Sequence, residues 1–163
     1  MSNNNIKIYL EDINQIKEKY NPNILSSSIS DYILRTCKGI PLKNNLTITI
    51  ITNKQVNKTL EEEITKLIKK HYQDHINELN ITAQYNAIKK SILTIIGIIS
   101  ILFSNILSSI TKILLPELFL IAGWVAIWEV VYSILFVGSK NKILKKRYQK
   151  LLKSPISFVT TKE

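Results

Sequence analysis

Two long stretches without Lys or Arg dominate the second half of the chain. Residues 91–111, between Lys90 and Lys112, hold no charged side chain. As a helix, these 21 residues would reach about 31 Å, which matches the roughly 30 Å hydrocarbon core of a bilayer. A second apolar stretch covers 116–138 and begins with Pro116, which suits a first helical turn. The pattern predicts two transmembrane helices, about 91–111 and 116–138, and their short link predicts an antiparallel hairpin.

The first 88 residues switch between strand-like and helix-like patterns. Residues 6–10 and 46–52 are rich in Ile and Thr and predict two strands. Residues 11–20 have apolar side chains at helical spacing, 28–39 begin with a capping-box pattern, and a longer apolar stripe starts near Thr59; each predicts a helix. The order is therefore β-α-α-β-α, and two strands are too few for an independent sheet.

A third strand is expected near the C-terminus. Residues 155–161 alternate in character, with Ile156 and Phe158 on one side. Because a hairpin returns the chain to the side of the membrane that it left, this strand can join the first two. The alternative is an edge strand that pairs with a neighbouring subunit.

The predicted fold class is therefore an α+β membrane protein. A small cytoplasmic β-α-α-β-α head, with its third strand from the C-terminus, sits on an antiparallel two-helix transmembrane hairpin. The predicted parts are the head at 1–88, the hairpin at 89–139, and a basic juxtamembrane helix with the returning strand at 140–163.

The formal net charge of +10 is unevenly distributed. Basic residues flank the predicted hairpin on its outer ends, whereas the link between its helices offers only Lys112. The positive-inside rule therefore predicts the cell inner (cytoplasmic) membrane, with both termini cytoplasmic. Anionic lipid headgroups are the expected partners of the basic segment, and nucleic acid is not, because the segment adjoins a membrane helix. The expected headgroup residues are Lys140, Lys142, Lys145, Lys146, Arg147 and Lys150.

Glu129 falls near the middle of the second predicted span, where a charged side chain costs about 2.5–3.5 kcal/mol. We expect it to form a hydrogen bond with Ser100 or Ser104 across the hairpin. Three interpretations stay open: a bridge between helices or protomers, a ring of carboxylates along a pore or proton path, and a place near the inner headgroups. Small or polar residues predict the packed faces, namely Gly97, Ser100, Ser104 and Ser108 on the first helix and Ala122, Ala126, Glu129 and Ser133 on the second.

The sequence offers no catalytic signature. It contains four Gly and no Gly-rich phosphate loop. His71 and His75 have the i, i+4 spacing of a metal pair, but HYQDH lacks the Glu of H-E-x-x-H. We expect a solvated helix face there; a metal site and a pairing with acids such as Asp74 across an oligomer are the alternatives. We expect no enzyme, no cofactor and no bound metal.

These features predict a non-enzymatic integral membrane protein that forms a homo-oligomeric ring or scaffold through its head and hairpin. The alternative is an oligomeric channel or membrane-disrupting effector with a ligand- or partner-sensing head. An accessory subunit of a larger membrane complex is a third hypothesis. The partner of the head, if it has one, cannot be named from the residues.

Overall fold

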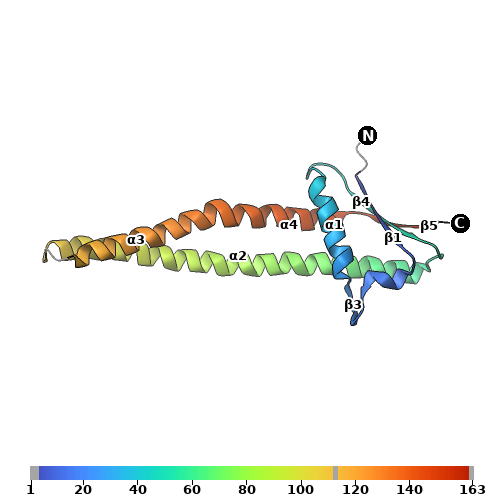
Figure 1. Ribbon diagram of the computed structural model, residues 1–163, viewed down its shortest axis with the longest axis horizontal. Coiled ribbons are helices and arrows are strands. Elements are labelled where there is room, and N and C mark those ends of the chain that lie inside the picture. The colour runs from blue at the N-terminus through green and yellow to red at the C-terminus, as the bar shows by residue number, and fades with distance from the viewer. Residues whose placement is uncertain (1–3, 112–113, 162–163) are drawn as a thin grey trace. The chain divides into compact units, whose positions relative to one another are not determined.

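The computed structural model describes residues 4–111 and 114–161 (Figure 1). The chain divides into two compact units, a head made of Met1–Glu78 with Leu144–Glu163 and a hairpin made of Leu79–Ile143. The sequence placed the first boundary at residue 88, where charged residues give way to apolar ones. The head's own contacts end earlier along the same helix.

A three-stranded parallel sheet forms the centre of the head. Its strands are β1 (Asn5–Leu10), β4 (Thr47–Thr52) and β5 (Ile156–Thr160), and β4 lies between the other two (Figure 1). The two pairings keep a regular register, in which Ile8 lies beside Ile50 and Ile50 beside Phe158. The prediction that the third strand comes from the C-terminus is confirmed.

One face of this sheet carries the core of the head. Ile6, Ile8, Ile48 and Ile50 are buried on it, whereas Phe158 on the outer strand is half-buried. Helix α1 (Ser27–Gly39), the first part of α2 (Lys58–Ser108) and the last part of α4 (Gly138–Lys153) supply the rest of the core. Their buried apolar side chains are Ile33, Cys37, Ile64, Ile68, Tyr72, Ile76, Tyr148 and Leu151.

The helix predicted at residues 11–20 is wrong. The segment forms a short 3-10 helix, η1 (Ile13–Ile16), followed by a two-stranded antiparallel sheet of β2 (Lys17–Glu18) and β3 (Asn21–Leu25). The Asp12 carboxylate accepts a hydrogen bond from the Asn14 backbone N–H at 2.9 Å, which closes a tight turn. This local hydrogen bond and the Asn21-Pro22 turn signal outweigh the weak helical spacing.

The hairpin unit contains the later part of α2, then α3 (Leu115–Tyr132), a π-helical turn η2 (Ser133–Val137) and the start of α4. Two helices, Lys58–Ser108 and Leu115–Lys153, are long and apolar enough to cross a membrane. Helix α2 runs without a break from the head unit into the hairpin unit. Pro116 and Glu117 lie in the first turn of α3, as expected from their chemistry.

Candidate functional site

The two helices of the hairpin meet through glycine. Gly97 on α2 and Gly123 on α3 are buried, and each lies against the backbone carbonyl of the other. A Cβ atom added to Gly97 would come within 3.2 Å of the Gly123 oxygen, and one added to Gly123 within 2.9 Å of the Gly97 oxygen. Small residues allow this kind of close helix approach in membranes.

Several of the predicted packing residues share this inner face. Ser104 is buried and its hydroxyl donates to the Pro116 carbonyl oxygen at 2.6 Å. Ser100, Ala126 and Ser133 are half-buried. Ser108 and Ala122 are exposed, so the structure does not place these two on the inner face.

The sequence led us to expect Glu129 beside Ser100 or Ser104. Glu129 is exposed and lines a small cavity of about 160 Å³ within the hairpin unit, together with Asn86, Lys89 and Lys90. Glu129 therefore lies level with the two lysines that precede the first apolar stretch.

The helix register explains the difference. Helix α2 ends at Ser108, where the hydroxyls of Ser108 and Ser109 both donate to the carbonyl oxygen of Asn105. The predicted first span ended later, at residue 111. The earlier end pairs Gly97 with Gly123 and Ser104 with Pro116, so Glu129 is carried past Ser100 toward Lys90.

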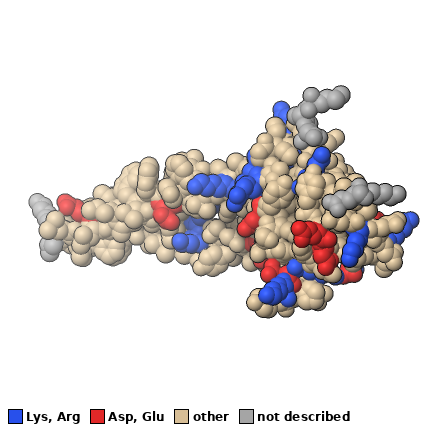
Figure 2. Space-filling model, turned by 45° about the vertical axis from the view of Figure 1, so that its right-hand side comes forward, with Lys and Arg blue, Asp and Glu red and all other residues tan. Residues whose placement is uncertain are grey.

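The outer surface of the hairpin is apolar. Large hydrophobic side chains are exposed along both helices, including Ile92, Phe103, Leu118, Trp124 and Trp128. On the face visible in Figure 2, Lys, Arg, Asp and Glu gather over the head, and the hairpin shows few charges. A surface of this composition is suited to lipid rather than to water.

The basic residues of α4 separate into groups with different surroundings. Arg147 is half-buried in the head, where its guanidinium donates to the carbonyl oxygens of Cys37 and Ile40 at the end of α1. The structure therefore commits Arg147 to the head rather than leaving it free for headgroups. Lys140, Lys142 and Lys146 are exposed, and Lys145 is half-buried.

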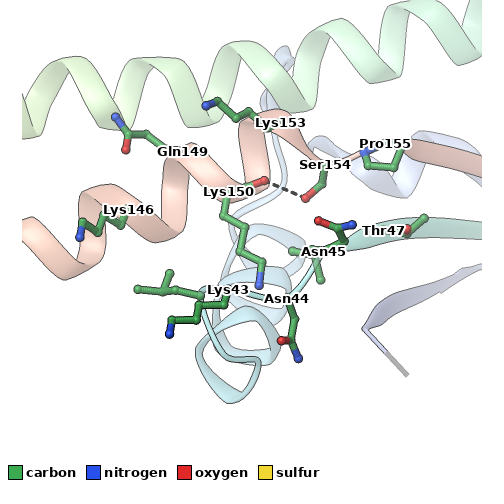
Figure 3. A pocket seen from close by; sticks show the side chains of 12 residues that line it. Lys43, Asn44, Asn45, Thr47, Lys146, Gln149, Lys150, Lys153, Ser154 and Pro155 are labelled. Atoms are coloured by element: carbon green, nitrogen blue, oxygen red, sulfur yellow. Dashed lines mark hydrogen bonds between the residues drawn. The ribbon is translucent and has the colours of Figure 1, made fainter. Parts of the chain in front are cut away.

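The largest cavity described in the head lies between the C-terminal part of α4 and the loop from α1 to β4. It has a volume of about 620 Å³ and takes four lysines, Lys43 from the loop and Lys146, Lys150 and Lys153 from one face of α4. Figure 3 shows these side chains with Asn44, Asn45 and Gln149 around them. We call this cavity the lysine pocket. Lys43 and Lys153 were not among the predicted site residues, although Lys146, Lys150 and Lys153 have the i, i+4, i+7 spacing of one helix face.

The second face of the parallel sheet is open at one end. Tyr9, Ile51 and Val159 lie side by side in the register of the three strands. Tyr9 is 71% exposed and Val159 48% exposed, and Ile51 between them is half-buried. Next to it, the Thr49 hydroxyl donates to Asn5 Oδ1 and contacts the Ser157 hydroxyl, both at 3.0 Å. We call this surface the open sheet face.

His71 and His75 do not form the solvated helix face that the sequence predicted. His71 Nε2 lies 2.7 Å from the Ser30 hydroxyl, and both histidines are half-buried. The His75 ring stacks on Tyr148 with centroids 5.1 Å apart, and its Nδ1 lies 3.0 Å from a Glu78 oxygen. The two rings also pack against each other. The sequence could not reveal this cluster, because Ser30 and Tyr148 come from helices far away in the chain.

Burial sets the proton affinities in this cluster. Desolvation lowers the pKa of His71, and the neighbouring His75 lowers it further, against the opposing charges of Asp74 and Glu78. Desolvation also raises the pKa of the hydroxyls of Tyr72 and Tyr148. These shifts favour the uncharged forms of His71, Tyr72 and Tyr148 near pH 7. Among the described residues, no group of three or more His, Cys, Asp or Glu could hold a metal ion.

Comparison of the chain with protein-family models, with curated proteins and with solved structures finds no match. The function is therefore inferred from the residues of this chain and their arrangement.

Proposed function

We propose that the protein is a non-enzymatic two-pass membrane protein that assembles into a homo-oligomer. The hairpin anchors each copy in lipid, and neighbouring heads meet through the open sheet face. The observation that carries this proposal is the apolar row of Tyr9, Ile51 and Val159 on a parallel sheet, whose two outer members are exposed.

Parallel sheets occur almost only with both faces covered, because their strands are apolar on both sides. In this head the helices cover one face, and the row on the other face exposes Tyr9 and Val159. A second copy of the chain presents the same row, so the surface can complement itself about a two-fold axis. Confinement by the hairpins to one membrane raises the effective concentration of heads for each other.

A cross-linking experiment tests this assembly. The only cysteine of the chain, Cys37, is buried, so a single added cysteine reports its own surroundings. Val159→Cys protein in its membrane should cross-link into dimers or larger species with a bismaleimide reagent. Tyr20→Cys is the matched control, because Tyr20 is 89% exposed and lies outside the three-stranded sheet.

Equal cross-linking of the two variants would overturn this interface. A lipid-nanodisc particle with the mass of one chain would overturn the homo-oligomer as a whole. The accessory-subunit hypothesis predicts such a one-chain particle. If the particle is larger, Val159→Lys should lower its mass only where the open sheet face holds the copies together.

The channel alternative receives less support from the surroundings of Glu129. Glu129 lines the same cavity as Lys89 and Lys90, and positive charges beside an acid oppose the passage of cations. Ion flux through liposomes that contain the protein, with and without Glu129→Gln, is the measurement that would revive this alternative.

Topology belongs to the same proposal. Basic residues flank both outer ends of the hairpin, which supports an orientation with both termini in the cytoplasm. In intact cells, an impermeant thiol reagent should not label Ser139→Cys, on the lysine-rich side. Labelling at that position would contradict the proposed orientation and indicate the opposite one.

A further inference from the structure

The lysine pocket is separate from the open sheet face, and its chemistry points to a ligand. We infer that the pocket binds a phosphomonoester group carried on a small organic moiety. Lys43, Lys146 and Lys153 supply the charge that neutralises the phosphate, and this inference stands independently of how the heads assemble.

The residues that line the pocket carry charge of one sign. Four of them are lysines, of which Lys43, Lys146 and Lys153 are exposed, and no Asp or Glu is among them. Across residues 4–111 and 114–161, the ion pairs within 4 Å are Lys17 with Glu63 and His75 with Glu78, and neither involves the pocket. Like charges gathered around one cavity repel each other, and a bound dianion removes that cost.

Capping of α4 does not explain why these lysines gather at the pocket. Basic side chains in a last helical turn commonly bond the free carbonyl groups there. Here Ser154 serves that end instead, since its hydroxyl donates to the Lys150 carbonyl oxygen at 2.8 Å and its N–H to the Leu151 oxygen at 3.2 Å. Lys43 lies outside the helix, and Lys146 precedes its last turn.

The walls of the pocket are already held in place. The Lys150 ammonium donates to the Pro41 carbonyl oxygen at 2.8 Å, and Arg147 donates to Ile40. These bonds fix the loop against α4 before any ligand arrives. A preorganised site loses less conformational entropy on binding.

The size and lining of the pocket indicate the class of ligand. A volume of about 620 Å³ falls in the roughly 300–1,000 Å³ range of small-molecule sites and exceeds the needs of one bare phosphate ion. Asn45 and Gln149 offer amides for hydroxyl groups, and Leu42 and Pro155 add apolar surface. Lysine binds phosphate as a compact point charge. A lipid headgroup and a soluble phosphomonoester share this chemistry.

The test uses the full chain in nanodiscs and separates these two sources. In one arm, glycerol 3-phosphate is titrated into protein in phosphatidylcholine nanodiscs by calorimetry. In the other arm, a few per cent of phosphatidic acid is added to the lipid, and native mass spectrometry counts the lipid retained on the protein. Binding in the first arm indicates a soluble ligand, and binding in the second arm alone indicates a headgroup.

Matched double variants decide whether the pocket is responsible. Lys146→Gln with Lys153→Gln should weaken binding by at least about tenfold, given the roughly 1 kcal/mol that each basic residue contributes near an anionic surface. Lys66→Gln with Lys69→Gln removes the same charge from exposed positions of α2 outside the pocket and should leave binding unchanged.

Equal loss in the two double variants would overturn the inference, because it would indicate charge alone. Absence of binding in both arms would overturn it as well. If the helix variants lower the melting temperature, Lys43→Gln on the loop takes their place, and an unchanged affinity in that variant would refute the pocket.

Discussion

Gly123 lies so close to Gly97 that an added Cβ atom would come within 2.9 Å of the Gly97 carbonyl oxygen and 2.6 Å of Ile101 Cγ1. The backbone oxygen cannot move aside as a flexible side chain can. The hairpin therefore depends on the absence of two side-chain carbons.

Gly123→Ala should separate the hairpin helices and destabilise the hairpin by about 1–3 kcal/mol, as overpacking typically does. Both tryptophans of the chain, Trp124 and Trp128, lie on α3, so their fluorescence reports hairpin unfolding in particular. Gly138→Ala is the matched control, because its nearest contact would be an ordinary 3.7 Å. Equal midpoints for the two variants would contradict the close glycine contact.

Arg147→Gln should destabilise the head by about 1–3 kcal/mol, because it removes charge-assisted hydrogen bonds from the carbonyl groups of Cys37 and Ile40. Hydrogen exchange should rise most at the C-terminal turn of α1. Lys145→Gln removes the same charge two residues earlier without a corresponding bond to α1 among the described contacts, so thermal denaturation should barely change. A matching loss in both variants would mean that charge, and not these bonds, stabilises the head.

Ending the chain after Ser154 should weaken the head while leaving the hairpin intact. Strand β5 pairs with β4 along its length, and Ile156 and Phe158 are half-buried, so the loss is expected at the lower end of about 1.5–3 kcal/mol per fully buried side chain. The amide protons of β4 should exchange faster, because this strand becomes an edge. Tryptophan fluorescence should stay as in the full chain; unchanged exchange in β4 would rule out the pairing.

Acid should destabilise the head through His71. Burial lowers the pKa of His71 below its ordinary 6.5, so the unfolded chain takes up the proton before the folded head does. This contribution is complete above pH about 6.5 and is lost as the pH falls from there toward the folded pKa. Denaturant titrations at several pH values should show the free energy of unfolding rising with pH through that range.

His71→Gln should flatten this slope, since glutamine can bond Ser30 without titrating. His75→Gln should keep most of the slope, because burial is a larger cause than the charge of His75. The groups around His71 are Ser30, Tyr72, Asp74, His75 and Glu78. A slope that survives in His71→Gln would assign the acid sensitivity to another of these groups.

Local sequence patterns predicted the elements whose own residues determine them. Alternation predicted β1, β4 and β5, and the long apolar stretches predicted the later part of α2 and α3, because these signals depend on many residues. The helix predicted at 11–20 failed because one hydrogen bond from Asp12 decides the conformation of a short segment. A short segment has too few side chains for the periodicity of its apolar residues to outweigh a single local hydrogen bond.

The sites depended on distances along the chain that patterns do not measure. The residues around Glu129 differ from those expected, because α2 ends at Ser108 and this earlier end shifts the register of α3 against α2. Lys43 and Lys153 are separated by most of the sequence and line one pocket because α4 and β5 return to the loop before β4. The i, i+4, i+7 lysines of α4 were visible, but the opposite wall of their pocket was not.

The order of the strands also imposes an order on biosynthesis. Strand β4 precedes the hairpin and β5 follows it, so the ribosome makes the last strand of the sheet only after both apolar helices have been made. Until then, β4 has one neighbour and the core of the head lacks Tyr148 and Leu151. A head in which β5 is paired therefore belongs to a chain whose hairpin has already been made. A chain that stalls between Leu115 and Lys153 leaves an incomplete sheet, which is accessible to proteases and chaperones.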